Sequence, residues 1–340
     1  MSHRRILIIY AGGTIGMVPS ANGFVPSARF ADDIGRLIVK HHGTGARHRL
    51  ITLDPLIDSA NASPHTWHRL ADLLWAERDH FDAAVILHGT DTLAYTASAL
   101  SFLLADLDKA VILTGAQIPF AMPASDGERN LQGAFAFARG PVREVCIFFD
   151  GVLLRGNRAR KWSTEPGDGF RSPHWPRLAH VNGSVDIDTS TLLAPTTPRC
   201  DPPPAIVTDR AAIVTLFPGI DASLLRAAAD HHRAGLVLGL HGAGTGPTAD
   251  PAIRRALTAI SADRIPLLGI SQCPHGTLNP ALYETGRQLA DCGVLNGRDL
   301  TPEAALAKLH TLSCQRCPAD DVAAAIAVPV AGELTPANGT

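Results

Sequence analysis

The sequence predicts an α/β fold of two domains, with a mostly parallel sheet in the larger N-terminal one. Apolar runs typical of buried strands alternate with stretches that have helical periodicity, which is the pattern of βαβ units. A proline-rich stretch interrupts this alternation, and 340 residues exceed the usual size of one domain. We therefore expect an N-terminal α/β catalytic domain over residues 1–192, a linker over 193–210 and a smaller C-terminal α/β domain over 211–340.

The individual elements follow from the same alternation. Thr301 and Pro302 suit the start of a helix, because threonine caps a helix N-terminus and proline fits its first turn. In the first half we expect strands over residues 5–10, 83–88, 110–114 and 144–149, and helices over 65–80, 92–104 and 127–137. In the second half we expect strands over 211–217, 235–241 and 265–271, and helices over 223–234, 249–261, 279–290 and 301–314.

Composition and charge exclude several classes of protein. A formal charge of −2 gives no basic stripe for nucleic acid, and no apolar run is long enough to cross a membrane. The apolar run over residues 6–10 is shorter than that of a secretory signal, about 7–15 residues. The six cysteines show no disulfide framework, and we interpret the lone CxxC of Cys314 and Cys317 as incidental helix cysteines. This pattern predicts a cytoplasmic protein.

The first block with chemical potential is AGGTIG, residues 11–16, directly after a predicted strand. Its glycines allow a sharp turn that exposes Thr14 at the end of the strand. A phosphate-binding turn is the alternative, although GxGxxG is not satisfied and no P-loop lysine follows. Alone, the block is equally compatible with a nucleotide-binding turn and with a nucleophile.

The second block is HGTDT, residues 88–92, which follows the strand expected over 83–88. Ligands bind at the carboxyl ends of strands in open α/β sheets, so we expect Thr90 and Asp91 to lie near Thr14. The simpler interpretation makes Asp91 or Thr92 a helix cap. A structural role is likewise the simpler interpretation for the strand-end histidines His88, His241 and His275. No HExxH or clustered ligand set predicts a catalytic metal.

The third block is a cluster of cations: Arg155, Arg158, Arg160 and Lys161. Such a cluster is usually a solvated loop, but this one follows a predicted strand and so belongs to the same edge of the sheet. A lysine beside Asp91 and Thr90 could take the hydroxyl proton if burial favoured its neutral form. A threonine nucleophile needs such help, because a hydroxyl is weakly nucleophilic at neutral pH. The three blocks together predict a hydrolase.

Taken together, the blocks resemble the bacterial-type L-asparaginases, and more specifically the cytoplasmic type I subgroup. The paired threonine blocks in this order and spacing make the resemblance specific, and it implies the two-domain fold of that family. It covers almost the whole chain, from YAGGTIGM through LIDSANAS, VILHGTDTLAYTASALSFLL, ILTGAQIP, SDGERNL and LRGNRARK to the terminal KLH and GELTP segments.

The resemblance implies a role for each matching residue. Thr14 would attack the side-chain amide carbon of L-asparagine, while Lys161 would keep Thr90 poised as a base or as an activator of water. Asp91 would orient the lysine and bind the substrate's α-amino group, and Ser59 would bind the α-carboxylate. The substrate-binding residues expected in all are Asp58, Ser59, Ala60, Gly89 and Gly13.

The resemblance also implies the course of the reaction and the assembly. Ammonia leaves first and water then releases aspartate, with no metal or organic cofactor. The only expected partners are the small-molecule substrate and further copies of the chain, in a homodimer or a homotetramer. In such dimers the C-terminal domain of one subunit closes the site of the other.

Two positions depart from the family pattern. Phe24 stands where the family has a tyrosine thought to help deprotonate the nucleophile, so the aromatic lid is kept without its hydroxyl. If that hydroxyl were the general base, its loss would lower the rate by roughly 10²–10⁴. Gly239 replaces an arginine that helps some type I members to bind an activating asparagine. We therefore expect weak or absent activation by asparagine.

Three alternatives to an L-asparaginase remain open. One is a broader amidohydrolase that also acts on glutamine or D-asparagine, since one methylene is worth only about 1–3 kcal/mol of discrimination. Another is an asparagine-binding protein with weakened catalysis, which only Phe24 supports. The third is the asparaginase-like subunit of a tRNA amidotransferase, for which we would expect an additional domain and a basic face.

Overall fold

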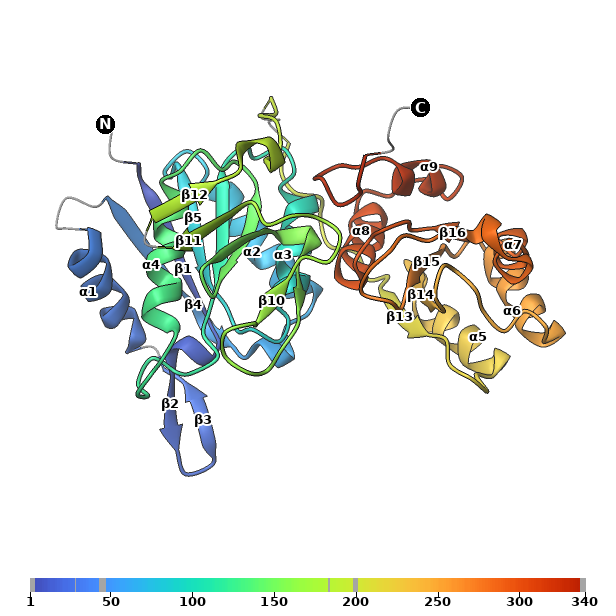
Figure 1. Cartoon of the computed structure of the whole chain (residues 1–340), viewed down its shortest axis with the longest axis horizontal. Helices are drawn as coiled ribbons and strands as arrows, with labels where there is room; N and C mark the ends of the chain where they lie inside the picture. The colour runs from blue at the N-terminus through green and yellow to red at the C-terminus, as the bar shows by residue number, and fades with distance from the viewer. Residues whose placement is uncertain (1–3, 28, 43–46, 183, 198–200, 337–340) are drawn as a thin grey trace. The chain divides into compact units, whose positions relative to one another are not determined.

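The chain folds into two compact units, Met1–Pro203 and Pro204–Thr340. The structure is a computed structural model, and it describes residues 4–27, 29–42, 47–182, 184–197 and 201–336 (Figure 1). The first unit contains a large, mostly parallel sheet and the second a smaller parallel sheet. The α/β fold class predicted from the sequence is therefore confirmed, and the division falls inside the proline-rich stretch.

A large sheet forms the centre of the first unit, in the order β12-β11-β8-β7-β6-β5-β1-β4. The strands β4, β1, β5, β6 and β7 run parallel, whereas β8, β11 and β12 add antiparallel pairs at one edge. Their bounds are β1 (Ile6–Gly12), β4 (His48–Ile57), β5 (Ala83–Leu87), β6 (Ala110–Thr114), β7 (Val145–Phe149), β8 (Val152–Arg155), β11 (Ala179–Asn182) and β12 (Ser184–Ile187).

Helices cover both faces of this sheet, which explains why its central strands read as continuous apolar runs. Figure 1 shows α1 (Phe30–His42) and α4 (Gly127–Ala138) on one side, with α2 (Pro64–Ala76) and α3 (Leu93–Leu103) on the other. Alternate residues of β1 face the first pair, so Ile6, Ile8 and Tyr10 join a buried cluster with side chains of α1 and α4. Every residue of β1 is buried.

Hairpins account for most elements that the sequence analysis missed. Asp150 and Gly151 have positive φ angles of 47° and 81° and join β7 to β8 by a two-residue turn, for which Asp-Gly is a favoured pair. Two further antiparallel ribbons are β2 (Met17–Ser20) with β3 (Gly23–Pro26), and β9 (Arg160–Lys161) with β10 (Phe170–Arg171).

The second unit has a four-stranded parallel sheet in the order β13-β14-β15-β16. Thr301 Oγ1 accepts a hydrogen bond from Ala304 N at 3.1 Å and so caps α8 as expected. The strands are β13 (Ala211–Thr215), β14 (Gly235–Leu240), β15 (Leu267–Ser271) and β16 (Val294–Asn296). The helices are α5 (Ala222–His231), α6 (Pro251–Ala262), α7 (Glu284–Asp291), α8 (Pro302–Cys314) and α9 (Val322–Ala327).

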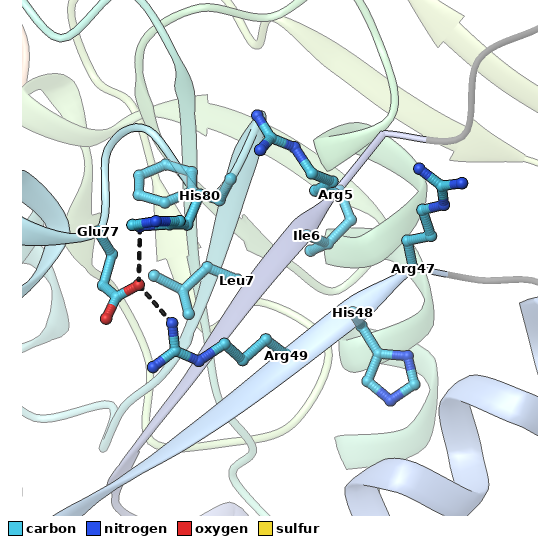
Figure 2. Close-up of a pocket in the computed structure, with 9 residues that line it drawn as sticks. Arg5, Ile6, Leu7, Arg47, His48, Arg49, Glu77 and His80 are labelled. Carbon is cyan, nitrogen blue, oxygen red and sulfur yellow. Dashed lines mark hydrogen bonds and ion pairs between the residues drawn. The ribbon is translucent and has the colours of Figure 1, made fainter.

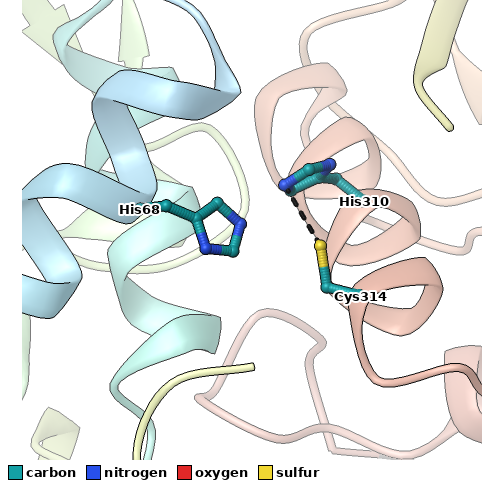
Figure 3. Close-up of side chains that lie close together, drawn as sticks. All are labelled: His68, His310 and Cys314. Carbon is teal, nitrogen blue, oxygen red and sulfur yellow. Dashed lines mark hydrogen bonds between the residues drawn. The ribbon is translucent and has the colours of Figure 1, made fainter. Parts of the chain in front are cut away.

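Two local expectations for this unit are wrong. The helix expected over 279–290 begins only at Glu284, because Pro280–Leu282 form a separate 3₁₀ turn. The CxxC pair is not contained in one helix, since α8 ends at Cys314 and Cys317 lies beyond it. The Cys314 thiol is buried and lies 3.5 Å from His310 Nε2, one turn earlier on α8 (Figure 3).

The cysteines of the described part of the chain, at 146, 273, 292, 314 and 317, are free thiols. Burial raises the pKa of the Cys146 thiol well above its ordinary value. Cys200 lies outside the described residues.

The packing of α4 on β7 yields a testable constraint. A Cβ at Gly133 would lie 2.1 Å from ring atoms of Phe148, so Gly133→Ala forces a shift in a filled core. We expect a loss of about 1–3 kcal/mol in the free energy of unfolding. Gly35→Ala on α1 is the matched control, because its Cβ meets nothing within 4 Å and alanine favours helix. Urea unfolding of both variants measures the difference, and equal midpoints would contradict this account.

Candidate active site

The turn after β1 carries Thr14 and lies against the turn after β5. Gly13 has a φ of 87°, and a Cβ there would lie 2.3 Å from the backbone of Gly89. Only glycine permits two main-chain segments to approach each other this closely. Thr14 starts the 3₁₀ turn Thr14–Gly16 and is half-buried. The structure thus brings the first two sequence blocks together at the carboxyl edge of the sheet.

Lys161 joins the second block through side-chain contacts. Its Nζ donates to Thr90 Oγ1 at 3.0 Å and to Asp91 Oδ1 at 2.5 Å. Thr90 is buried, whereas the Asp91 side chain is 60% exposed and so remains open to a ligand. A cation, a hydroxyl and a carboxylate in direct contact can move a proton or stabilise a developing charge.

The loop after β4 brings Ser59 to the same place. A Cβ at Gly89 would lie 2.3 Å from Ser59 Oγ, so the buried Ser59 hydroxyl lies against the second block. Asp58 Oδ1 accepts a hydrogen bond from Ala60 N at 3.2 Å and caps the 3₁₀ turn Ser59–Asn61. The main chain of Ala60 is thereby fixed beside Ser59.

Thr92 also contributes to this arrangement. It occupies the N-cap position of α3 but makes no side-chain capping bond. Its hydroxyl instead donates to Ser59 O at 2.8 Å. Thr92 therefore ties the β4 loop to the β5 turn, and the helix-cap interpretation is wrong for its side chain.

The cation cluster is not a solvated loop. Arg155 and Arg158 are almost fully buried, and Arg155 Nε lies 2.6 Å from Glu144 Oε2. Both guanidinium groups lie over the Trp175 ring, at 4.9 Å and 5.4 Å from its centroid. A buried cation needs such partners. Glu144 and Trp175 escaped the sequence analysis, because no local pattern connects them to the arginines.

His88 has a structural role here. It is completely buried, its Nδ1 lies 2.8 Å from Gly89 O, and its Nε2 lies 3.1 Å from Thr96 Oγ1. Since the carbonyl can only accept, Nδ1 carries the proton and Nε2 accepts from the threonine. Burial lowers the pKa of His88 below its ordinary value. His241 and His275 belong to the second unit.

Phe24 lies on β3 of the hairpin that follows the Thr14 turn. It pairs with Pro19 across the hairpin, and its side chain is 47% exposed. At the base of the hairpin the Tyr10 hydroxyl donates to Ser27 O at 3.1 Å, and burial raises the pKa of Tyr10 to about 12.

A pocket of about 300 Å³ lies at the opposite edge of the sheet, at the amino ends of β1 and β4 (Figure 2). Its charges are largely paired: Arg49 and His80 both contact Glu77, and Arg5 pairs with Asp82. None of the residues expected in the site lines this pocket. We therefore place the candidate site at the carboxyl edge.

Comparison with known proteins identifies the family. Its Asparaginase, N-terminal model matches residues 5–192, and the Glutaminase/Asparaginase C-terminal domain model matches residues 210–325. The chain belongs to the asparaginase family. This family member is 37% identical to L-asparaginase 1 of Escherichia coli strain K12 over 341 residues, 99% of each chain. The resemblance noted from the sequence is thus confirmed.

Solved structures of the family agree with this assignment. L-asparaginase I from Vibrio cholerae matches with a TM-score of 0.87 and 35% identity, over 98% of this chain and 100% of that one. The thermostable L-asparaginase from Thermococcus kodakarensis also matches with a TM-score of 0.87, at 29% identity over the same shares. Among the described residues of this asparaginase-family chain, no helix is both long and apolar enough to cross a membrane.

The buried His88 predicts a pH dependence of stability. The pKa of His88 is lower in the folded state than in the unfolded state. Below about pH 6.5 the unfolded chain therefore binds more protons at this residue than the folded chain does. The free energy of unfolding therefore falls as the pH falls below about 6.5. We expect His88→Gln to make that slope shallower by up to about 1.4 kcal/mol per pH unit. Urea unfolding between pH 5 and 8 measures both slopes, and parallel slopes would show that folding does not lower the pKa of His88.

Proposed function

We propose that this family member hydrolyses L-asparagine to L-aspartate and ammonia, with Thr14 as the nucleophile. The contact of Lys161 Nζ with both Thr90 and Asp91 carries the proposal. It lies at the same sheet edge as the Thr14 turn, in a chain that matches a named L-asparaginase over its full length. A nucleophile with a separate hydroxyl–carboxylate–amine group suits acyl transfer from an amide.

The proposed reaction has two halves. Thr14 Oγ1 attacks the amide carbon, the C–N bond breaks, and the hydroxyl proton leaves with the nitrogen as ammonia. Water then attacks the threonine ester, one of its protons returns to Thr14 Oγ1, and aspartate is released. The Thr90–Lys161 pair moves the protons in both halves, and Asp91 keeps the lysine in place.

The proposed clamp recognises the zwitterionic end of the substrate. The 60% exposed Asp91 carboxylate suits the α-amino group, and the Ser59 hydroxyl suits the α-carboxylate. The remaining proposed binding residues are Asp58, Ala60, Gly13 and Gly89. Asp58 acts chiefly by fixing the Ala60 main chain through its capping bond.

The proposal also covers the lid, the domain boundaries, the cellular compartment and the oligomeric state of the enzyme. Phe24 serves as an aromatic lid without proton chemistry. Residues 1–192 form the catalytic domain, 193–210 the linker and 211–340 the C-terminal domain. The enzyme works in the cytoplasm as a homodimer or homotetramer, for which sedimentation velocity is the direct test.

Loss of the proposed nucleophile tests the function itself. We expect the wild type to release ammonia from L-asparagine and Thr14→Ala to lower kcat by about 10³-fold or more. Thr14→Ser keeps a hydroxyl and serves as the control. L-glutamine as a comparison substrate separates a strict asparaginase from a broader amidohydrolase. Unchanged turnover in Thr14→Ala would refute the nucleophile, and asparagine binding without turnover in the wild type would favour the binding protein.

Variants of Phe24 test which residues transfer the protons. If Thr90 and Lys161 move the protons, Phe24→Tyr should change kcat by less than about tenfold, well below the 10²–10⁴ typical of a general base. Phe24→Leu removes the ring as a control for its role as a cover and should raise KM. A gain of 100-fold or more in Phe24→Tyr would instead identify a disarmed asparaginase.

A further inference from the structure

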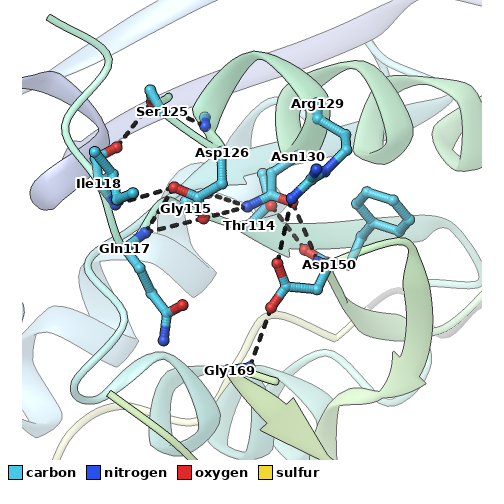
Figure 4. A network of polar contacts seen from close by, with 12 residues as sticks. Thr114, Gly115, Gln117, Ile118, Ser125, Asp126, Arg129, Asn130, Asp150 and Gly169 are labelled. Atoms are coloured by element: carbon cyan, nitrogen blue, oxygen red, sulfur yellow. Dashed lines mark hydrogen bonds and ion pairs between the residues drawn. The ribbon is translucent and has the colours of Figure 1, made fainter. Parts of the chain in front are cut away.

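The segment that follows Lys161 is connected by hydrogen bonds to a largely buried polar network. Figure 4 shows this network, which joins the ends of β6 and β7 to the start of α4. None of its members belongs to the three sequence blocks. Buried polar groups are costly unless paired, so a network of them that is bonded to the segment after Lys161 calls for a reason.

Asn130 is the centre of this network. It is 0% exposed, and its Nδ2 donates to Gly115 O and to Asp126 Oδ2, both at 3.0 Å. Its Oδ1 accepts from Asp150 N at 3.2 Å. One amide therefore fixes the ends of two strands relative to the start of α4.

The first connection to Lys161 runs through Asp150. Its Oδ2 accepts from Gly169 N at 3.1 Å, and Gly169 O accepts from Trp162 N at 2.8 Å. Trp162 directly follows Lys161, and Lys161 itself pairs with Phe170 across the β9–β10 ribbon. The Asp150 carboxylate thus holds Gly169, which directly precedes the strand partner of the lysine.

The second connection runs through Gln117. Asp126 accepts hydrogen bonds from the main-chain nitrogens of Gln117 and Ile118, at 3.0–3.1 Å. The Gln117 side chain then donates from Nε2 to Ser163 O at 3.0 Å. The main chain is therefore held at both residues that follow Lys161. Trp162 N is bonded to Gly169 O, and Ser163 O is bonded to the Gln117 side chain.

We propose that Asp150 and Gln117 are positioning residues, which hold the segment after β9 so that Lys161 Nζ stays against Thr90 and Asp91. Neither residue contacts the lysine amine; both act through the main chain that carries it. The inference rests on the proposed function for its effect on turnover, but the position of the amine can be measured separately.

The turn at Asp150 dictates which substitutions are informative. Its φ of 47° would strain an alanine, whereas Gly-Gly and Asn-Gly both suit this two-residue turn. Asp150→Gly therefore removes the carboxylate without changing the turn. Asp150→Asn keeps an oxygen that can accept from Gly169 N. Gln117→Leu removes the second connection and leaves a side chain of similar size.

The reactivity of the lysine amine is a direct readout. The chain has four lysines, Lys40, Lys109, Lys161 and Lys308, and trace labelling with acetic anhydride can be followed for each by peptide mass spectrometry. Lys40 is the internal reference, because its side chain is 62% exposed. We expect the Lys161/Lys40 labelling ratio to rise about fivefold in Asp150→Gly, comparable with losing one hydrogen bond.

Matched variants decide between positioning and general stability. Gln117→Leu should raise the ratio as Asp150→Gly does, and Asp150→Asn should restore it. Asp188→Gly is the control, because Asp188 also bonds a main-chain nitrogen, that of Ser190, at 3.1 Å, without a connection to Lys161. A lowered unfolding midpoint with an unchanged ratio in both Asp150→Gly and Gln117→Leu would overturn the proposal.

Turnover supplies the second readout. In Asp150→Gly we expect kcat on L-asparagine to fall by up to about 100-fold, as for a displaced catalytic group, with little change in KM. If the wild type shows no turnover, the proposed function is refuted. If Asp150→Gly still raises the Lys161/Lys40 labelling ratio in that case, the positioning role stands. A normal kcat in Asp150→Gly would overturn the positioning role alone.

Discussion

The site depends on one constraint, the contact between the main chains of Gly13 and Gly89. A single Cβ on either residue would overlap the opposite main chain or Ser59. The strands β1 and β5 are neighbours in the sheet, and the turns that follow them approach each other at van der Waals distance. This crossing brings the Thr14, Ser59 and Thr90 segments to one edge. The two glycines thus permit the close approach of these segments.

Much of this arrangement could be predicted from the sequence, because its signals are local. Thr14 and Thr90 each follow a buried strand, and carboxyl ends of parallel strands share one edge. The residues alone make Lys161 a candidate at this edge, and its catalytic role is assigned only through the family resemblance. Its contacts with Thr90 and Asp91 span 71 and 70 residues, and no periodicity encodes such a pairing.

The burial of Arg155 and Arg158 shows why the remainder was not predictable. A run of cations is usually solvated, but here Glu144 pairs with Arg155 and the Trp175 ring lies under both guanidinium groups, and these partners come from other segments of the chain. The network around Asn130 also joins separate elements, since two of its partners lie just after β6 and in the β7–β8 turn. Side-chain contacts between separate elements determine the burial of the arginines and the Asn130 network. The secondary-structure propensities of the individual residues do not predict such contacts.

The proposed chemistry divides between the carboxyl edge of the sheet and an exposed hairpin. The edge is fixed by main-chain contacts and buried hydrogen bonds, whereas the hairpin presents Val18, Phe24 and Val25 to solvent. A phenylalanine gains by covering a ligand, because burial of its ring removes apolar surface from water, but it has no proton to exchange. In the proposed reaction Phe24, on β3 of the hairpin, can cover the substrate but cannot transfer a proton. In the proposed reaction the proton transfers therefore fall to the carboxyl edge of the sheet, where Lys161 contacts a hydroxyl and a carboxylate.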